Sequence, residues 1–244
     1  MLKKIFAFLL CIVLISSCSK HDPILPGVRY DVFESTDVQV TNQKVPDLSE
    51  NVKKIHGDDD CEYKQDAMNN IWMGENKIFS GFSMGSIVKS NQKPICVERF
   101  IYTGLSTGEV VKINTVTRKK VWATDVFKET SFTGGTLIAD IVARVGIDGK
   151  YVYAGGLGDA FCKLKAENGT KVWCLDISVP VDFIIVDNFA FVVGTDDNLY
   201  AINTDDGKVY WKTEIKKQAT PKYDGKNIII KKQKIDYKTG EILK

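Results

Sequence analysis

The chain has 244 residues, of which 44% are apolar and 26% are charged, a composition typical of a globular protein with a substantial core. The formal net charge is +2. Without Lys3 and Lys4, which lie in a segment expected to be removed, 31 basic residues (33 − 2) balance 31 acidic ones. This balance excludes a protein drawn to nucleic acid by a strong overall positive field.

Residues 1–17 are predicted to form a lipoprotein signal peptide. Two lysines precede the apolar run Ile5–Ile15, which is too short to span a bilayer comfortably. The run leads into Leu14-Ile15-Ser16-Ser17-Cys18, which resembles a bacterial lipobox. That resemblance implies lipidation of Cys18 and, because Ser19 follows, sorting to the outer membrane as a peripheral, lipid-anchored protein. An ordinary signal peptide followed by an unrelated cysteine is the alternative.

Residues 18–75 are interpreted as a tether and an extended polar arm. The tether, Ser19–Arg29, is polar and broken by proline, and residues 31–47 alternate weakly, enough for one edge strand. The acidic run Asp58-Asp59-Asp60 lacks the alternating ligands and the glycine of a calcium loop. We therefore interpret that run as a solvated loop.

Residues 76–244 carry a repeated β pattern. Two copies align without a gap, so that Gly169 falls on Gly207 and Trp173 on Trp211, in each case 38 residues apart (207 − 169). A period near 40 is typical of propellers and solenoids, whose units bury their faces only by stacking on neighbours. Each turn ends in glycine, which accepts the positive φ of a tight turn. Each tryptophan is expected to dock between neighbouring units.

Two further copies have diverged, and a hairpin precedes them. Trp122 begins the series of tryptophans, but its turn Thr117-Arg118-Lys119 lacks glycine. The last copy keeps Gly240, and Lys244 stands where its tryptophan would be. Lys77–Phe82 and Gly85–Lys89 are predicted to form the short hairpin. Beyond the signal segment we find no convincing helix, so the chain is predicted to be all-β.

Four cysteines remain once Cys11 and Cys18 are set aside, and an oxidising compartment would permit them to form disulfides. Cys162 and Cys174 flank one predicted hairpin and are a possible pair. A shift of one residue in register would place them on opposite faces, so the pairing among these two, Cys61 and Cys96 stays open. The sequence contains no CxxC motif, so it suggests neither a thioredoxin-like redox site nor a zinc ribbon.

The sequence contains few residues that are candidates for catalysis. The two histidines, His21 and His56, lie in the tether and the arm, so neither a nucleophile–histidine site nor a histidine-based metal site is expected. The glycine-rich segment Gly155–Asp159 does not match a phosphate-binding loop, and it aligns with a hairpin turn at Gly194. We expect no catalytic residue, no metal and no cofactor.

The segments Leu199–Asn203, Asp206-Gly207-Lys208 and Trp211 resemble the PQQ-like (quinoprotein) propeller repeat. With the lipobox and the tether Leu25–Arg29, the chain is similar to the BamB family of propeller lipoproteins from the outer-membrane β-barrel assembly machinery. The resemblance implies a non-enzymatic scaffold on the periplasmic side, with a BamA-like partner bound through propeller loops and edges.

The chain departs from that family's eight-bladed ring. At roughly 40 residues per blade, the 227 residues (244 − 17) that follow the signal, less the arm, hold about four blades, an incomplete ring. Open edges would invite self-association. A shortened survivor, half of a dimeric ring and a degenerate remnant are all compatible with this count. Another lipid-anchored binding module and a quinoprotein enzyme are the functional alternatives, although the adjacent cysteine pair of that enzyme class is missing.

Overall fold

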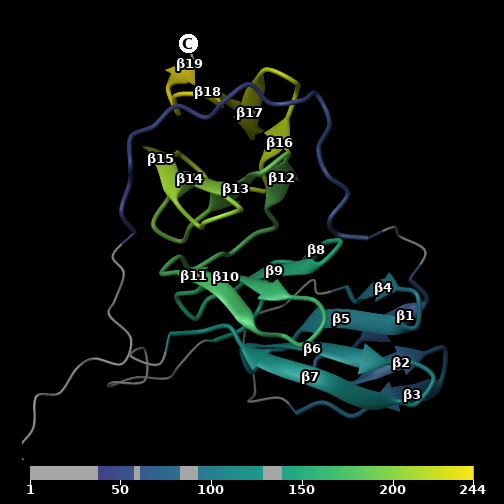
Figure 1. The fold of residues 1–244 in the computed structure, drawn as a ribbon. Helices are drawn as coiled ribbons and strands as arrows, with labels where there is room; N and C mark the ends of the chain where they lie inside the picture. Colours follow the sequence, from purple (N-terminus) through teal and green to yellow (C-terminus); the bar gives the residue numbers. More distant parts are fainter. Residues whose placement is uncertain (1–37, 58–60, 83–92, 129–138, 244) are drawn as a thin grey trace, which may run out of the picture. The chain divides into compact units, whose positions relative to one another are not determined.

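The computed structural model describes residues 38–57, 61–82, 93–128 and 139–243, and all regular structure in these ranges is β-strand (Figure 1). In chain order the strands are β1 (Tyr63–Gln65), β2 (Ile71–Met73), β3 (Asn76–Phe79), β4 (Ile95–Val97), β5 (Phe100–Gly104), β6 (Glu109–Asn114), β7 (Lys119–Asp125), β8 (Gly146–Asp148), β9 (Tyr151–Gly155), β10 (Phe161–Lys165), β11 (Lys171–Leu175), β12 (Ile184–Val186), β13 (Phe189–Val193), β14 (Asn198–Asn203), β15 (Val209–Glu214), β16 (Lys222–Tyr223), β17 (Asn227–Ile230), β18 (Gln233–Asp236) and β19 (Ile242–Leu243).

These strands form five antiparallel sheets in which neighbours in sequence are neighbours in space. We number them along the chain as the first (β1–β3), second (β4–β7), third (β8–β11), fourth (β12–β15) and fifth sheet (β16–β19). The last four sheets have four strands each, which is the blade unit of a propeller. The all-β fold that the sequence predicts is confirmed.

The first sheet begins earlier than the sequence analysis placed it. β1 and β2 precede Asn76 and lie inside residues 18–75, which we had assigned to the tether and arm, so a three-stranded sheet adds to the expected four. The reason is that each strand has only three residues and β1 is polar, so neither shows a readable alternation. Of the hairpin predicted over residues 77–89, β3 covers the start, and residues 83–92 lie outside the described residues.

Each of the three central sheets carries the same β-bulge. The register between the last two strands shifts at Lys112/Ile113, at Lys163/Leu164 and at Ala201/Ile202, which are equivalent positions of the repeat. The extra residue in the outer strand comes directly before the tryptophan. A bulge at a fixed place twists the outer strand in the same way in every copy, and it directs the next side chain toward the neighbouring sheet.

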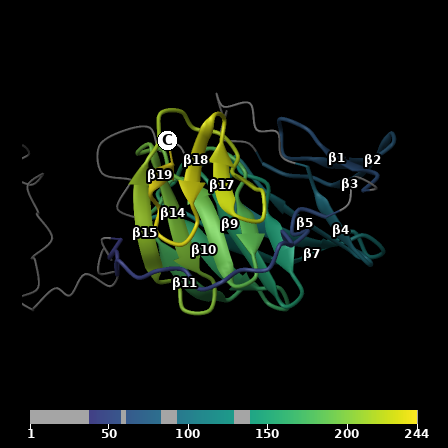
Figure 2. The ribbon, with the colours of Figure 1, turned by 90° about the horizontal axis from the view of Figure 1, so that it is seen from above.

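The core consists of four apolar seams between successive sheets. Ile71 and Ile113 join the first sheet to the second, Trp122 and Leu164 the second to the third, Phe161 and Ile185 the third to the fourth, and Phe191 and Ile235 the fourth to the fifth. In Figure 2 the strands of the fifth sheet lie over those of the fourth, and the apolar cluster between the two sheets forms the last seam. Among the described residues no apolar cluster joins the first sheet to the fifth, so these seams form a series and not a closed ring.

Candidate functional site: the seams and the arm

The repeat tryptophans form the seams by bonding to the next sheet. Each indole N–H donates to a backbone carbonyl three residues before the turn glycine, or its equivalent, of the following sheet. The bonds are Trp122 to Ala166 (3.2 Å), Trp173 to Thr204 (3.1 Å) and Trp211 to Tyr237 (3.0 Å). A buried indole therefore contributes apolar contact area and a satisfied polar group to the same seam.

The turn glycines seat the tryptophan rings. Gly169, Gly207 and Gly240 have φ values of 76°, 76° and 77°, in the left-handed region that favours glycine. A Cβ at these positions would lie 2.8 Å, 3.0 Å and 2.7 Å from the ring of the tryptophan on the preceding sheet. Arg118 occupies the equivalent place in the second sheet and has a φ of 55°, also in the left-handed region.

Two lysines reinforce the same carbonyls from inside the protein. Lys112 donates to the carbonyl of Ala166 (3.0 Å) and Lys163 to that of Thr204 (2.7 Å), each sharing its acceptor with a tryptophan. Both side chains are buried, and Lys163 lies 3.9 Å from the centre of the Tyr151 ring. Burial lowers the pKa of the Lys163 ammonium, and it raises the pKa of neighbouring Tyr153 to about 12.

The sequence analysis missed these two lysines because a lysine in a strand is expected to face solvent. The internal repeat of the sequence nevertheless contained a signal that could have identified these lysines. Lys112 and Lys163 pair across their sheets with Trp122 and Trp173, whereas the residue that pairs with Trp211 is Ala201. A lysine repeated at one position opposite a core tryptophan indicates a seam contact.

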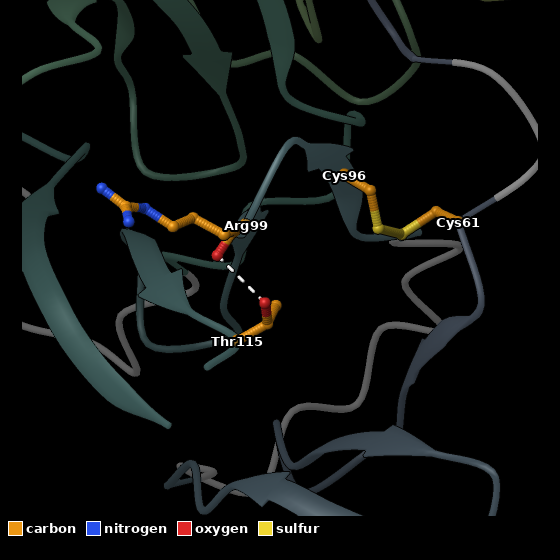
Figure 3. The surroundings of a disulfide bond; sticks show 4 residues. All are labelled: Cys61, Cys96, Arg99 and Thr115. Carbon is orange, nitrogen blue, oxygen red and sulfur yellow. Dashed lines mark hydrogen bonds between the residues drawn. A yellow bond between two sulfur atoms is a disulfide. The ribbon is translucent and has the colours of Figure 1, made fainter. Parts of the chain in front are cut away.

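The four cysteines form two disulfides. Cys162 and Cys174 face each other across β10 and β11, with a Cα–Cα distance of 4.1 Å, so this bond lies within the third sheet. Cys61 joins Cys96 with a Cα–Cα distance of 5.4 Å, linking the residues before β1 to strand β4 (Figure 3). Close to this bond, the Thr115 hydroxyl donates to the carbonyl of Arg99 (3.1 Å), which ties two turns of the second sheet together (Figure 3).

The arm, residues 38–57, contacts three sheets, in the order fourth, fifth, fourth and third. The N–H groups of Thr41 and Gln43 donate to β15 carbonyls, and Val45 donates to the carbonyl of Lys238 in the fifth sheet. The arm then returns to the fourth sheet through Lys53 and reaches the third through Ile55 (Figure 1). Val45 and Ile55 are 1% and 2% exposed, so the arm is anchored in the core at these two residues and is not a loose tether.

Charged and polar groups hold the arm at its turns. Both carboxylate oxygens of Asp187 accept hydrogen bonds from Ser49, and donation by the Ser49 N–H lowers the pKa of Asp187. Lys53 forms an ion pair with Asp148 (2.7 Å). The ring nitrogens of His56 lie 3.0 Å and 2.8 Å from the carbonyl oxygens of Val145 and Phe183, which precede the first strands of the third and fourth sheets. This residue therefore holds the arm to both sheets.

The arm covers the outer edge of β15, and Val209 is the residue of that edge which it buries. It is 1% exposed and forms a parallel bridge with Val40, whereas the equivalent residues of the open edges of β7 and β11 are the exposed Lys120 and Lys171. Lysine at an exposed edge discourages aggregation through uncontrolled edge-to-edge pairing. The residue type at this position, valine on β15 and lysine on β7 and β11, therefore distinguishes the edge that the arm covers from the two exposed edges.

We predict that Val209→Lys releases the start of the arm. A lysine there would have to be buried beneath Val40, so stability should fall by about 2–3 kcal/mol. Hydrogen exchange at the amides of Thr41 and Gln43 measures the release directly. Val172→Lys, at the exposed position next to Lys171, is the control and should leave both amides protected. Protection that persists in the Val209 variant would contradict this account of the edge.

A groove of about 400 Å³ lies between the arm and the turns of the fourth sheet, with Phe189 and Tyr210 among its lining residues. Its charged groups already have partners. Asp187 binds Ser49, Asp205 accepts a hydrogen bond from Asn188, Asp47 pairs with Lys238, and Lys53 pairs with Asp148. The groove is therefore a product of arm docking and supplies no free group for a ligand.

The other residues singled out from the sequence bring no chemistry to this site. Cys18 lies outside the described residues. Within residues 38–57, 61–82, 93–128 and 139–243, no group of three or more His, Cys, Asp or Glu side chains could hold a metal ion. In the same ranges no helix is long and apolar enough to cross a membrane.

Sheets repeated along the chain and joined by tryptophan–glycine seams define a protein built from PQQ-like propeller repeats. The family model described as outer membrane protein assembly factor BamB matches residues 80–213 and 163–241, together more than half of the chain, so the chain belongs to this family. The outer membrane protein assembly factor BamB of Legionella pneumophila (strain Paris) is 22% identical over 126 residues, which are 52% of this chain and 33% of that protein.

Solved structures agree at the level of the fold. The crystal structure of BamB from Moraxella catarrhalis superimposes with a TM-score of 0.60 at 15% identity, covering 74% of this chain and 61% of that one. A quinohemoprotein alcohol dehydrogenase from Comamonas testosteroni gives a TM-score of 0.40 at 21% identity, over 51% of this chain and 21% of that one, which is too low to support an argument. The chain spans about a third of the curated relative and about three fifths of the solved BamB.

Proposed function

We propose that the protein is a non-enzymatic lipoprotein scaffold of the outer-membrane β-barrel assembly machinery, held at the periplasmic side of the outer membrane by lipid on Cys18. Membership of the BamB family is the observation that carries this proposal. A scaffold needs a rigid body, an anchor and a protein-binding surface, and no catalytic group. The described residues supply rigidity through the seams, the two disulfides and the docked arm.

The partner in this proposal is a BamA-like barrel-assembly protein. The surface available to it consists of the loops of the sheets and the open outer edges of β7 and β11, whose Val121 and Val172 are 48% and 41% exposed. Extended segments of a partner can add to such edges through backbone hydrogen bonds, while side-chain pockets provide specificity. No chemical step is required of the scaffold.

The test is recovery of partners from the native membrane. The full-length protein carries a C-terminal tag, is crosslinked gently, and the captured proteins are identified. A BamA-like protein and its lipoprotein companions should be recovered with wild type. A Cys18→Ala variant should leave the membrane fraction and lose them. Recovery of copies of this chain alone, or of nothing, would refute the scaffold assignment and favour another binding module or a remnant.

A further inference from the structure

Charge is distributed unevenly along the chain, although the total is close to neutral. Residues 212–244 contain 10 lysines and 4 acidic residues, a net charge of +6. Residues 1–211 contain 23 basic (33 − 10) and 27 acidic (31 − 4) residues, a net charge of −4. A basic segment at one end of a near-neutral chain indicates a local anionic partner. In this structure the segment forms β15 beyond its tryptophan and all of the fifth sheet.

Seven exposed lysines lie on the fifth sheet and its connections, and we call six of them, all except Lys226 in the turn between β16 and β17, the basic end. Two lie in the loop before β16 and two in the turn between β17 and β18. The backbone N–H of Lys216, in the loop before β16, donates to Gln233 Oε1 (2.8 Å), which follows the turn between β17 and β18. The loop and the turn are therefore neighbours. The other two lie on β16 and β18. The six are Lys216, Lys217, Lys222, Lys231, Lys232 and Lys234.

The six lysines of the basic end form no salt bridge within the described part of the protein, although Lys234 interacts electrostatically with the carboxylate of Asp224. The salt bridges among the described residues use Lys53, Lys128, Arg144, Lys208 and Lys238 and none of these six lysines. By contrast, Lys238, on the arm side of the same sheet, is paired with Asp47. Six like charges on one sheet repel one another in solution, and an external anionic surface would relieve that repulsion.

Apolar side chains share the outer face with two of these lysines. Cross-strand pairing places Lys222 opposite Ile229, Ile229 opposite Lys234, and Lys234 opposite Leu243, so all four side chains stand on one face. The opposite face, with Ile228 and Ile235, is buried against the fourth sheet. Leu243 is 42% exposed. The outer face therefore combines positive charge with aliphatic surface.

From this combination we propose that the basic end docks on a bilayer containing anionic phospholipid. Each lysine near an anionic surface adds to the attraction, and aliphatic side chains can enter the interface between headgroups and acyl chains. A lipid chain on Cys18 would be one membrane signal, and stable attachment of a peripheral protein takes two. The twenty residues from Cys18 to Val38 can extend at most about 70 Å, long enough for both signals to reach one bilayer.

This inference rests on the proposed function only for the presence of a membrane, and vesicle binding tests it apart from any protein partner. The protein used is residues 19–244, exported so that its disulfides form. It carries no lipid and retains every contact described above. Vesicles of phosphatidylcholine with about 30% phosphatidylglycerol should sediment it, and vesicles of phosphatidylcholine alone should not. Raising the salt concentration should weaken the binding, because the charges involved are exposed.

The decisive variant is Lys216→Gln, Lys217→Gln, Lys231→Gln and Lys232→Gln combined. Its partition coefficient onto the anionic vesicles should fall roughly tenfold or more. The matched control changes four exposed lysines of other strands to glutamine, namely Lys119, Lys120, Lys165 and Lys171, and should stay within about twofold of wild type. Equal loss in both variants, or failure of the wild-type protein to bind, would overturn the proposal while leaving the scaffold assignment untouched.

Discussion

Replacing Trp211 with alanine is expected to lower the free energy of unfolding by about 3–5 kcal/mol, the usual cost of deleting a large buried aromatic side chain. The ring is 4% exposed, packs against Phe191, and seats on Gly240 of the fifth sheet. Its N–H is also a donor to the carbonyl of Tyr237, which would lose that partner. Urea denaturation followed by circular dichroism measures the change. The adjacent exposed Lys212→Ala should shift stability by no more than about 0.5 kcal/mol.

A double-mutant cycle with Gly240 tests whether the seam is the cause. In the wild-type background, Gly240→Ala would place a Cβ 2.7 Å from the Trp211 ring and strain a residue with φ 77°. In the Trp211→Ala background the contact with the ring is gone, whereas the backbone strain of about 1 kcal/mol and the approach of Thr213 Oγ1, also 2.7 Å from that Cβ, remain. A coupling energy above about 1 kcal/mol would support the seam. Strict additivity would show that the two residues act independently and would contradict the proposed contact.

Loss of the Cys61–Cys96 disulfide is expected to cost about 4 kcal/mol by the chain-entropy estimate, because the bond closes a loop with a sequence separation of 35. The change is a Cys61→Ala and Cys96→Ala double variant, measured by the same urea unfolding. The bond fixes the residues that lead from the arm into the first sheet. Its removal should therefore also increase hydrogen exchange in β1 and β2.

The second disulfide provides the comparison. Cys162→Ala with Cys174→Ala opens a loop with a separation of only 12, for which the same estimate gives about 3 kcal/mol, and it leaves exchange in the first sheet unchanged. The two variants should thus differ in where protection from hydrogen exchange is lost and in how far the free energy of unfolding falls. If the Cys61 variant were as stable as wild type with β1 still protected, the link between arm and first sheet would be dispensable.

Features that repeat locally could be predicted from the sequence. The turn glycines and tryptophans recur at fixed spacing, and each demands its residue type for a reason visible in one unit: positive φ for Gly207, a large apolar anchor for Trp211. The same holds for the all-β fold, because alternation and turn signals are local.

Features that depend on distant parts of the chain could not be predicted. β1 gained a partner only through its turn, in which Asp66 accepts hydrogen bonds from the N–H groups of Met68 and Asn70, a pattern that resembles any surface loop in sequence. Lys163 looks like a surface residue until a carbonyl of the next sheet is placed against it. Docking of the arm requires Val45 to meet Lys238, and no local pattern encodes that pairing.

The contact between the arm at the start of the chain and the fifth sheet at its end bears on the order of folding. Each sheet pairs strands that are close in sequence and can form as soon as its residues are available, one sheet after another. The arm comes first in the chain, yet its Leu48 N–H bonds to the Tyr237 hydroxyl across 189 positions, a contact with a high loop-closure cost. The arm therefore docks last, after the fifth sheet exists. If the chain is exported as proposed, a molecule held at its N-terminus would keep its arm undocked until the C-terminal strands had passed through the membrane.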